Sequence, residues 1–408
     1  MPGGYPMTSK LDLRPSDLVG FSRLANGAVA GVTDLVEAVH GKVAQTSSGV
    51  GNSPAQLSAG ITALVYSSIR GVTGLIDRGL LASEPLLPPE NQRPSSVKRE
   101  ALLAAVNGVL GDYLVATNNP LALSISMRRR GRSLVIERHA LQSAIARPTG
   151  KVLLLVHGLC LNDLKWKRNG HDHPAALSRD LGYTPVYLHY NSGLHVSDNG
   201  RSLAALLEAL LDQWPVAVQE LAIIGHSMGG LVARSAHHYA TEAGYHWPRH
   251  LRTLIFLGTP HHGAPLERLG NWVDTALELS PYTLPFARLG KIRSAGITDM
   301  RYGNLLAEDW QGLDRFAPGS DLRHPLSLPQ DVCSYAIAAT RQPLGSSDTD
   351  VLGDGLVMLD SALGRHLNLE MNLNFPVSNQ WVAYGTNHWN LLSNRAVYET
   401  IRGWLKHC

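Results

Sequence analysis

The stretch "LAIIGHSMGG", residues 221–230, decides the fold of this chain. Four largely apolar residues run into a Gly-His-Ser-Met-Gly turn, and an apolar-periodic segment with Leu231, Val232 and Tyr239 follows. A buried strand, a turn of small residues and a helix, in that order, are typical of a serine held on a strained bend at the carboxyl edge of an α/β sheet. Gly and Ser are also ordinary turn residues, so partners for Ser227 must come from elsewhere in the chain.

Short apolar segments alternate with helical segments around this turn. The expected strands cover 151–156, 185–190, 220–225, 251–258, 332–339 and 380–384, and helices are expected near 174–181, 198–213, 228–243 and 392–405. Wholly apolar strands separated by helices are buried on both faces of a sheet. The pattern predicts an α/β fold with a mostly parallel sheet and helices on both faces. The stretches "LALSISM" and "SLVIER" predict a hairpin that leads into it.

The chain divides near residue 118. Its 408 residues suffice for one large α/β domain and an extension. Residues 1–117 carry apolar side chains at three- and four-residue spacings, which predicts an N-terminal helical extension. We expect it to pack as a cap or a dimer arm, while its small residues leave docking on a membrane surface open. The α/β domain then covers 118–408, with a lid or cap insert at about 263–330.

Composition argues against a nucleic-acid partner. The formal net charge is +3, and no dense basic face with interleaved aromatic residues occurs, so a nucleic-acid partner is not expected. The basic run Arg128-Arg129-Arg130-Gly131-Arg132 is interpreted as a solvated hairpin turn.

The cysteines and the N-terminal residues indicate the cellular compartment of the protein. Cys160, Cys333 and Cys408 are too few and too scattered for a disulfide framework or a zinc site, which suits a reducing compartment. The first residues lack the features of a signal peptide, and no stretch of about 18 apolar residues occurs. We therefore expect a cytoplasmic protein, with peripheral membrane association open.

A serine hydroxyl becomes a useful nucleophile only when a base takes its proton. In this architecture the order is serine, then acid, then histidine, with the histidine after the last strand. "WVAYGTNHWNLL" supplies His388 at that place, and "DTDVLGDGLVMLDSALG" supplies the acid. Asp354 is preferred because it stands between two glycines, which allow a sharp turn; Asp350 is the second choice.

Two backbone N–H groups are expected to form an oxyanion hole. One is that of Met228, directly after the nucleophile at a helix N-terminus. The other is that of Leu159, in the loop after strand 151–156, which His157 and Gly158 shape. A role for His157 as a second catalytic base is not expected.

The long insert carries apolar residues and follows a histidine pair. Trp272, Leu277 and Phe286 belong to an apolar face that is expected either to cover an acyl pocket or to form the core of a small cap. In "FLGTPHHGAP", residues 256–265, His261 and His262 point apart on a strand or loop and lack a spaced carboxylate. No metal site and no cofactor are therefore expected.

These motifs together resemble the α/β-hydrolase superfamily, in particular bacterial lipases and esterases of the triacylglycerol-lipase type. The matching pieces are "VHGL", "GHSMGG", "GTPHHGAP", "GDGLV" and "NHWNLL", in family order over roughly 118–408. The resemblance implies Ser227 as nucleophile, Asp354 as acid, His388 as base, Leu159 and Met228 as oxyanion donors, and a lid at 263–330. Trp389 and Asn390 replace the Leu-Asp that follows the histidine in secreted lipases, so their calcium site is not carried over.

The expected activity is hydrolysis of hydrophobic acyl esters through an acyl-enzyme. The expected substrate is a small hydrophobic ester or a lipid, and aliphatic polyesters are an extension of that class. The "GTPHHG" segment is similar to inositol-deacylase-like hydrolases too, so a membrane-associated lipid-deacylating hydrolase is one alternative. Others are an acyltransferase with the same triad and a binding protein on an inactive hydrolase fold. The N-terminal helices are the expected site of any membrane contact or homodimer.

Overall fold

The computed structural model describes residues 12–27, 95–264, 293–315, 321–345 and 353–408. These residues fall into two compact units. The larger unit holds the described residues of 95–115 and those from 122 onward, and the smaller unit holds 12–27 and 116–121. The candidate active site lies in the larger unit.

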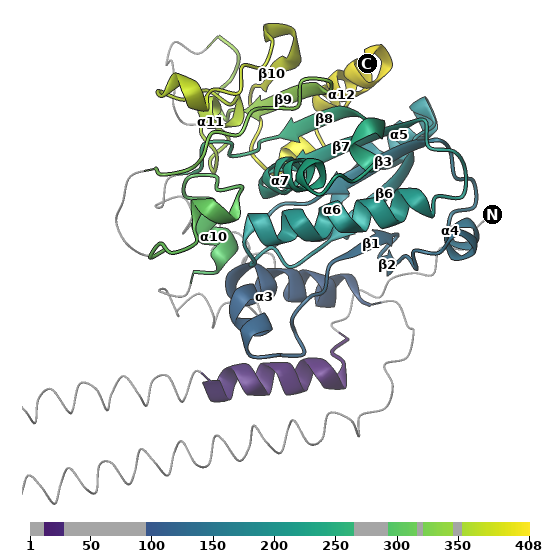
Figure 1. The fold of residues 1–408 in the computed structure, drawn as a ribbon, viewed down its shortest axis with the longest axis vertical. Helices are drawn as coiled ribbons and strands as arrows, with labels where there is room; N and C mark the ends of the chain where they lie inside the picture. The colour runs from purple at the N-terminus through teal and green to yellow at the C-terminus, as the bar shows by residue number, and fades with distance from the viewer. Residues whose placement is uncertain (1–11, 28–94, 265–292, 316–320, 346–352) are drawn as a thin grey trace, which may run out of the picture. The chain divides into compact units, whose positions relative to one another are not determined.

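The larger unit is built on one eight-stranded sheet (Figure 1). Its strands are β1 (Ser126–Arg129), β2 (Arg132–Ser133), β3 (Lys151–Val156), β6 (Thr184–His189), β7 (Glu220–His226), β8 (Leu251–Leu257), β9 (Cys333–Ala339) and β10 (Gln380–Ala383). Their order is β10-β9-β8-β7-β3-β6-β1-β2, and only the β1 and β2 pairings are antiparallel. The chain turns from one side of β3 to the other between β6 and β7, and ligands of open α/β sheets bind outside the strand ends at such a point.

Helices cover both faces of this sheet. On one face, α5 (His173–Leu181) and α12 (Arg395–His407) contribute Leu177, Val397 and Ile401 to a core with Leu153 and Leu155 of β3. On the other face, α6 (Val196–Asp212) and α7 (Met228–Glu242) lie in front of the strands in Figure 1. Because alternate side chains of a strand point to opposite faces, an almost wholly apolar strand such as β3 serves both layers.

The predicted fold class is confirmed, and the strands lie within one or two residues of their expected positions. The strand at 151–156 has the predicted bounds, and the others differ at their ends. The hairpin is much shorter than "LALSISM" and "SLVIER" indicated, because only residues 128–129 pair with 132–133. Alternating residue types indicate extended backbone, but they do not indicate which residues form hydrogen bonds with a neighbouring strand.

Helix α3 (Val97–Ala116) lies with the sheet rather than with residues 12–27. Most of its residues are buried, including the polar Glu100 and Asn107. The Asn107 side chain accepts a hydrogen bond from the N–H of Leu123 at 2.9 Å and donates one to the carbonyl of Leu103. The division into 1–117 and 118–408 stays a prediction.

The smaller unit is described around a helix at 15–27. The Arg23 guanidinium donates to the carbonyls of Thr117 and Asn118, at 2.7 and 3.0 Å. The Asn119 side chain donates to the carbonyl of Gly20 at 3.1 Å. The rest of the predicted N-terminal helices lies outside the described residues.

One prediction about the cysteines is wrong. Cys333, at the start of β9, and Cys408, at the end of α12, form a disulfide with Cα atoms 6.5 Å apart. Their separation of 75 residues gave no sign of this, because the sheet topology rather than the local sequence brings them together. Cys160 is free and buried, and burial raises the pKa of its thiol to about 12.

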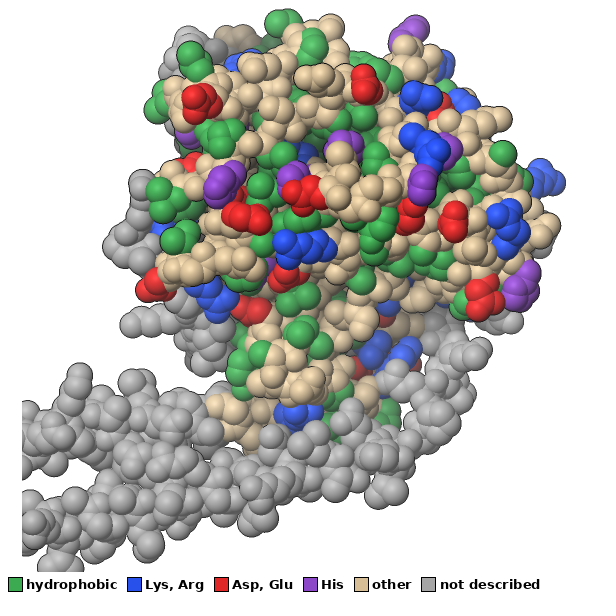
Figure 2. Space-filling model, in the orientation of Figure 1, with side chains coloured by type: hydrophobic (Ala, Val, Ile, Leu, Met, Phe, Trp, Pro, Cys, Tyr) green, Lys and Arg blue, Asp and Glu red, His purple; other side chains and the backbone are tan. Residues whose placement is uncertain are grey.

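Charged side chains of both signs are interspersed over the face shown in Figure 2. This distribution is in keeping with the small net charge of +3. Within the described ranges, none of the helices combines the length and the apolar character needed to cross a bilayer.

Candidate active site

Ser227 occupies the strained bend that the sequence predicts. It follows β7 and precedes α7, with φ 57° and ψ −130°. A residue with a side chain in such a conformation costs about 1–3 kcal/mol, so its surroundings must hold it there. The Ser227 N–H donates to the carbonyl of Leu257 at 2.8 Å, and the Ser227 carbonyl accepts from Gly230 at 3.0 Å. The serine is fixed between the ends of β7 and β8.

Three glycines let the bend pack against its neighbours. A Cβ on Gly225 would lie 2.5 Å from Cα of Gly230. One on Gly229 would lie 2.2 Å from the carbonyl oxygen of Val156, and one on Gly230 would lie 2.1 Å from Oγ1 of Thr259. Non-bonded atoms do not approach this closely, so a larger residue at any of the three would push the start of α7 away from the sheet.

Gly229→Ala is therefore expected to destabilise the protein by several kcal/mol, because the atom it meets belongs to the rigid backbone of β3. Urea unfolding of the purified variant and of the unaltered protein measures the difference in their free energies of unfolding. Gly403→Ala, inside α12, is the matched control. No atom lies within 4 Å of a Cβ at Gly403, and alanine there should stabilise the helix by about 0.5–1 kcal/mol. Equal stabilities of the two variants would contradict the close packing of the bend.

The backbone around the expected oxyanion donors lies beside the serine. A Cβ on Gly158 would be 2.9 Å from Cβ of Ser227, so the loop that carries Leu159 runs directly against it. The loop is fixed by the Tyr190 hydroxyl, which donates to the carbonyl of His157 at 2.7 Å. Met228 is the first residue of α7, where N–H groups have no partner inside the helix. Both N–H groups thus belong to fixed backbone next to Ser227.

Asp354 and His388 form a buried pair. The Nδ1 atom of His388 lies 2.6 Å from Oδ2 of Asp354, and both side chains are about 1% exposed. The other carboxylate oxygen accepts from the N–H groups of Leu356 and Val357, at 2.9 and 2.8 Å. A carboxylate accepts the Nδ1 proton, so this contact selects the tautomer whose Nε2 lone pair can take a proton. The structure brings these two predicted residues together.

His388 lies beside the Ser227 bend. Its ring is 4.7 Å from the ring of His226, the residue before Ser227, and its carbonyl lies 3.2 Å from Nε2 of His226. A Cβ on Gly258, after β8, would be 3.1 Å from the His388 ring. No described residue, and therefore not His388 either, forms a hydrogen bond with Oγ of Ser227. Catalytic hydrogen bonds are often long in the absence of substrate and shorten when it binds.

Other buried histidines near the bend stay neutral. Burial lowers the pKa of His157 to about 4, and its ring stacks on Tyr190 with centroids 4.4 Å apart. Burial, followed by the neighbouring His388, lowers the pKa of His226 well below its usual value. Neutral rings add no charge that would repel a proton arriving on His388.

The folded protein is expected to lose stability as the pH falls from about 6.5 to 4. Burial lowers the pKa of both His157 and His173 to about 4, so the unfolded chain takes up their protons first. Each fully developed shift of this size corresponds to about 3 kcal/mol. Denaturant unfolding at pH 7, 5.5 and 4 measures the change in the free energy of unfolding. The raised pKa values of Asp163 and Asp299 act in the opposite direction near pH 4. A constant free energy of unfolding from pH 7 to 5.5 would contradict neutral burial.

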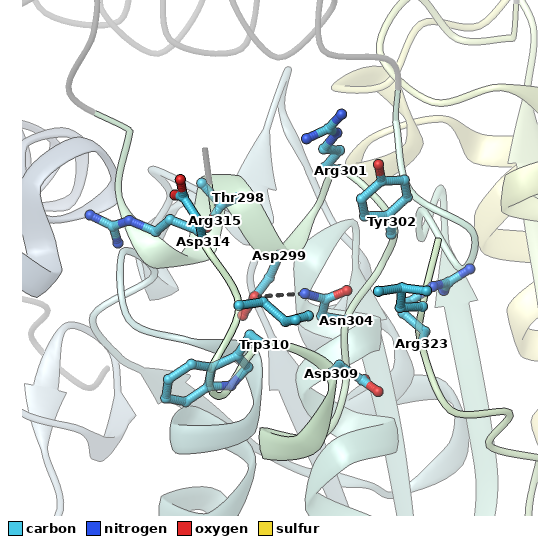
Figure 3. A pocket seen from close by; sticks show the side chains of 12 residues that line it. Thr298, Asp299, Arg301, Tyr302, Asn304, Asp309, Trp310, Asp314, Arg315 and Arg323 are labelled. Atoms are coloured by element: carbon cyan, nitrogen blue, oxygen red, sulfur yellow. Dashed lines mark hydrogen bonds between the residues drawn. The ribbon is translucent and has the colours of Figure 1, made fainter. Parts of the chain in front are cut away.

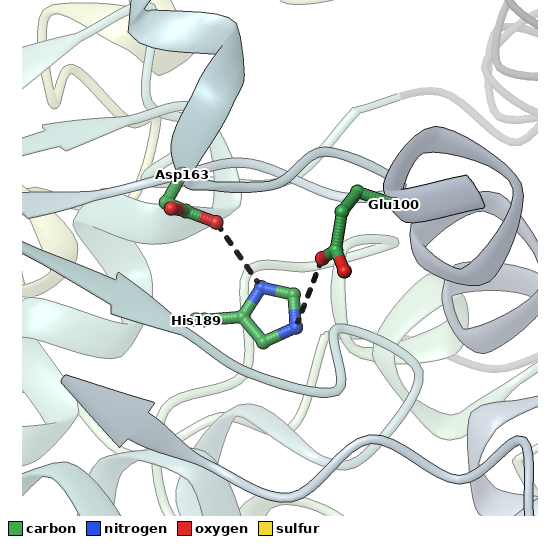
Figure 4. A group of neighbouring side chains, drawn as sticks. All are labelled: Glu100, Asp163 and His189. Carbon is green, nitrogen blue, oxygen red and sulfur yellow. Dashed lines mark ion pairs between the residues drawn. The ribbon is translucent and has the colours of Figure 1, made fainter. Parts of the chain in front are cut away.

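A buried charge cluster, which no local sequence pattern indicates, joins α3 to the sheet (Figure 4). His189 of β6 lies between two carboxylates, 3.6 Å from Asp163 and 4.0 Å from Glu100. The Arg128 guanidinium donates to both, at 2.7 Å to Glu100 and 3.3 Å to Asp163. Glu100, Asp163 and His189 could together hold a metal ion, but Arg128 already supplies a cation to both carboxylates. The cluster ties α3 to the segment that follows Leu159.

Close packing also joins α3 to the loops after β3 and β6. A Cβ on Gly108 would lie 2.2 Å from Sγ of Cys160, next to Leu159. A Cβ on Gly193 would lie 2.1 Å from the carbonyl of Asn107. The Asn191 side chain donates to the carbonyl of Gly111 at 3.1 Å. Helix α3 is therefore a support for the loop that carries one expected oxyanion donor.

The described part of the insert forms a small cavity of about 170 Å³ (Figure 3). It lies around α10 (Ala295–Asp299), and Asp299, Asn304 and Trp310 are among its lining residues. Asp299 accepts from Asn304 at 3.2 Å, and Trp310 stacks on His195 with centroids 3.6 Å apart. The expected substrate-binding residues Trp272, Leu277 and Phe286 lie outside the described residues, so the lid stays a prediction.

The histidines of "GTPHHG" take separate positions, as expected for neighbours in a loop. His261 is fully buried and meets the ring of Phe256 edge-on, with centroids 4.8 Å apart. His262 lies instead near His366, with ring centroids 5.0 Å apart. His261 also accepts a hydrogen bond from Arg234 of α7 at 3.3 Å.

Comparison with known proteins agrees with this architecture. A family model described as the PGAP1-like alpha/beta domain matches residues 147–327, somewhat less than half of the chain. That segment contains β3, β6, β7 and β8, the Ser227 bend and the "GTPHHG" loop. The chain has the α/β-hydrolase fold. The resemblance of the motifs to the α/β-hydrolase superfamily is thus confirmed. No curated protein sequence matches the chain.

Several solved structures are similar to this α/β-hydrolase at low identity. A lipase from Bacillus licheniformis in its mature form is 18% identical, with a TM-score of 0.41, over 64% of this chain and 95% of the lipase. A lipase-esterase related protein from Clostridium acetobutylicum is 14% identical, with a TM-score of 0.35, over 63% and 95%. An esterase from Pyrococcus furiosus is 16% identical, with a TM-score of 0.35, over 64% and 82%.

Proposed function

We propose that this α/β-hydrolase is a serine ester hydrolase with Ser227 as nucleophile, His388 as general base and Asp354 as the acid that orients it. The contact of 2.6 Å between Asp354 and His388, at the edge of the sheet where Ser227 stands on its bend, is the observation that carries the proposal. A buried carboxylate held by two backbone N–H groups and an imidazole is suited to orienting a base.

The reaction begins with proton transfer. Nε2 of His388 takes the Ser227 proton as Oγ attacks the ester carbonyl carbon, and Asp354 stabilises the imidazolium that forms. The tetrahedral oxyanion is bound by the N–H groups of Leu159 and Met228, each worth about 3 kcal/mol in the transition state. His388 then protonates the departing alcohol, which leaves an acyl-serine. Water attacks the acyl-serine by the same steps and releases the acid.

The substrate proposed is an ester of a hydrophobic acyl group. Ser227, Met228 and Leu159 are fully buried, so the reacting ester must leave water to reach Oγ, which favours an apolar acyl group. A lipid ester or an aliphatic polyester would meet this condition, as would a small hydrophobic ester.

A panel of p-nitrophenyl esters from acetate to palmitate tests the proposal. We expect turnover of these esters, with kcat/KM higher for medium chains than for acetate because apolar acyl groups gain burial. Inactivity toward all chain lengths in the presence and absence of detergent would contradict ester hydrolysis. A preference for acetate alone would contradict only the hydrophobic acyl site.

The same acyl-serine can pass its acyl group to an alcohol, so the acceptor needs its own experiment. Hydrolysis is expected to dominate when glycerol or a long-chain alcohol competes with water, as measured by the ratio of acid to new ester. If new ester forms in excess at low alcohol concentration, the protein is an acyltransferase with the same three catalytic residues.

A further inference from the structure

His226, the last residue of β7, connects the Ser227 bend to His388. Its side chain is fully buried, and Nε2 of its ring lies 3.2 Å from the carbonyl oxygen of His388. A carbonyl oxygen only accepts hydrogen bonds, so Nε2 of His226 must carry a proton and donate. The side chain directly before Ser227 therefore holds the backbone of His388.

His226 is not suited to carrying protons in the reaction itself. With its proton on Nε2, the other ring nitrogen, Nδ1, holds a lone pair, and no described residue forms a hydrogen bond with it. Burial, followed by the neighbouring His388, lowers the pKa of His226 well below its usual value. A general base works best when its pKa lies near the pH of the reaction. The hydrogen bond to residue 388 thus indicates a positioning role rather than proton transfer.

The backbone of His388 is held on both sides. Its N–H donates to the carbonyl of Asp354 at 3.3 Å, and its carbonyl accepts from His226. Asp354 also contacts Nδ1 of the ring, at 2.6 Å, and so sets the tautomer and the orientation of the imidazole. The His226 contact sets the place of the residue relative to Ser227, because residues 226 and 227 are adjacent in the chain. A movement of His388 away from the bend must lengthen this hydrogen bond.

His226 itself belongs to fixed backbone. It is paired with Leu257 of the parallel strand β8, and the carbonyl of Leu257 accepts from the N–H of Ser227 at 2.8 Å. Nδ1 of His226 lies against the loop after β3, because a Cβ on Gly158 would be 3.3 Å from it. The hydrogen bond thus ties the loop that carries His388 to the end of a central strand.

We infer that His226 is a positioning residue, which keeps Nε2 of His388 within reach of Oγ of Ser227. The inference rests on the proposed function. Displacement of a reacting group by about 1 Å can lower a rate by about 100-fold. Loss of the hydrogen bond should therefore lower kcat, whereas KM should change little because the bond acts on the base and not on the substrate.

Two side chains of similar length separate the hydrogen bond from the filling of space. Methionine and glutamine are both unbranched, and only glutamine donates. His226→Met should lower kcat for a p-nitrophenyl ester by about 10- to 100-fold, and His226→Gln should recover most of this loss. His139→Met, at an exposed position of α4 (Arg138–Ala144), should keep full activity. Full activity in His226→Met, or equal losses in the two variants of His226, would overturn the inference.

The pH profile of kcat/KM gives a second readout. His226→Met should keep the midpoint of the unaltered protein at a lower rate, because the base and its acid are still present. A shifted midpoint would make His226 part of the proton transfer and would overturn the positioning role. If the unaltered protein hydrolyses no ester, the proposed function fails. If the unaltered protein and His226→Met are equally active, only the role of His226 fails.

Neutron diffraction from crystals of the unaltered protein tests the contact without any variant. It should show deuterium on Nε2 of His226, directed at the carbonyl oxygen of His388, and none on Nδ1. Deuterium on Nδ1 alone would overturn the inference. This readout depends neither on ester hydrolysis nor on the folding of a variant.

Discussion

Replacing Ser227 by alanine should lower kcat for a p-nitrophenyl ester by about 10⁶-fold, because removal of a catalytic serine leaves only the oxyanion hole and substrate binding. The bend itself should persist. Its backbone hydrogen bonds to Leu257 and Gly230 do not involve Oγ, and Oγ has no partner in the described part of the chain. The thermal unfolding of the variant is therefore expected to match that of the unaltered protein.

Labelling with a fluorophosphonate identifies the reacting atom. Mass spectrometry should place one adduct on the peptide that contains Ser227, and Ser227→Ala should lose it. Ser202→Ala is the matched control, because Ser202 is exposed on α6 and bonds to the carbonyl of Asp198 within its own helix. Full esterase activity in Ser227→Ala would remove the nucleophile from the proposed mechanism.

Replacing Asp354 by asparagine should lower kcat by about 10⁴-fold with little change in KM, because an amide can donate to Nδ1 and favour the wrong tautomer of His388. The Asp354 side chain also accepts from Leu356 and Val357, and the asparagine oxygen can keep those bonds. Steady-state kinetics at pH 8 show whether the loss of activity lies in kcat or in KM.

Two other aspartates sharpen this test. Asp360→Asn is the control, because Asp360 is exposed and pairs with the exposed Arg365 at 3.6 Å. Asp350, the second choice for the acid, lies outside the described residues, and its asparagine variant should keep activity. A large loss in Asp350→Asn with near-normal Asp354→Asn would assign the acid to residue 350 instead.

The parallel strands could be predicted because their residue types carry the information locally. A run such as "KVLLLV", buried on both faces, has few alternatives. The edge hairpin was overestimated because β1 and β2 are partly exposed, and polar residues there leave the extent of pairing undefined.

The pair of Asp354 and His388 could be predicted because both follow strands of the same parallel sheet. Carboxyl ends of parallel strands meet at one edge, so topology alone brings residues 34 positions apart into reach. Glycines on both sides of Asp354 supplied a further local signal, and both have positive φ.

The contacts of α3 and the disulfide could not be predicted from local patterns. Glu100, Arg128, Asp163 and His189 come from four separate elements, and nothing in their flanking residues indicates that they meet. The disulfide depends on where α12 ends against β9, which is a property of the assembled sheet. The sequence predicts that residues up to 117 form a helical extension, whereas α3 is buried largely by loops far along the chain.

The place of α3 has a practical consequence for protein production. A truncated protein that starts at residue 118 would keep every strand of the sheet but would remove Glu100, which binds Arg128, and Gly108, which covers Cys160. The back of the Leu159 loop would then face water, and the guanidinium of Arg128 would keep only Asp163. A recombinant fragment that holds the sheet should therefore begin upstream of residue 95, well before residue 147, where the match to the family model starts.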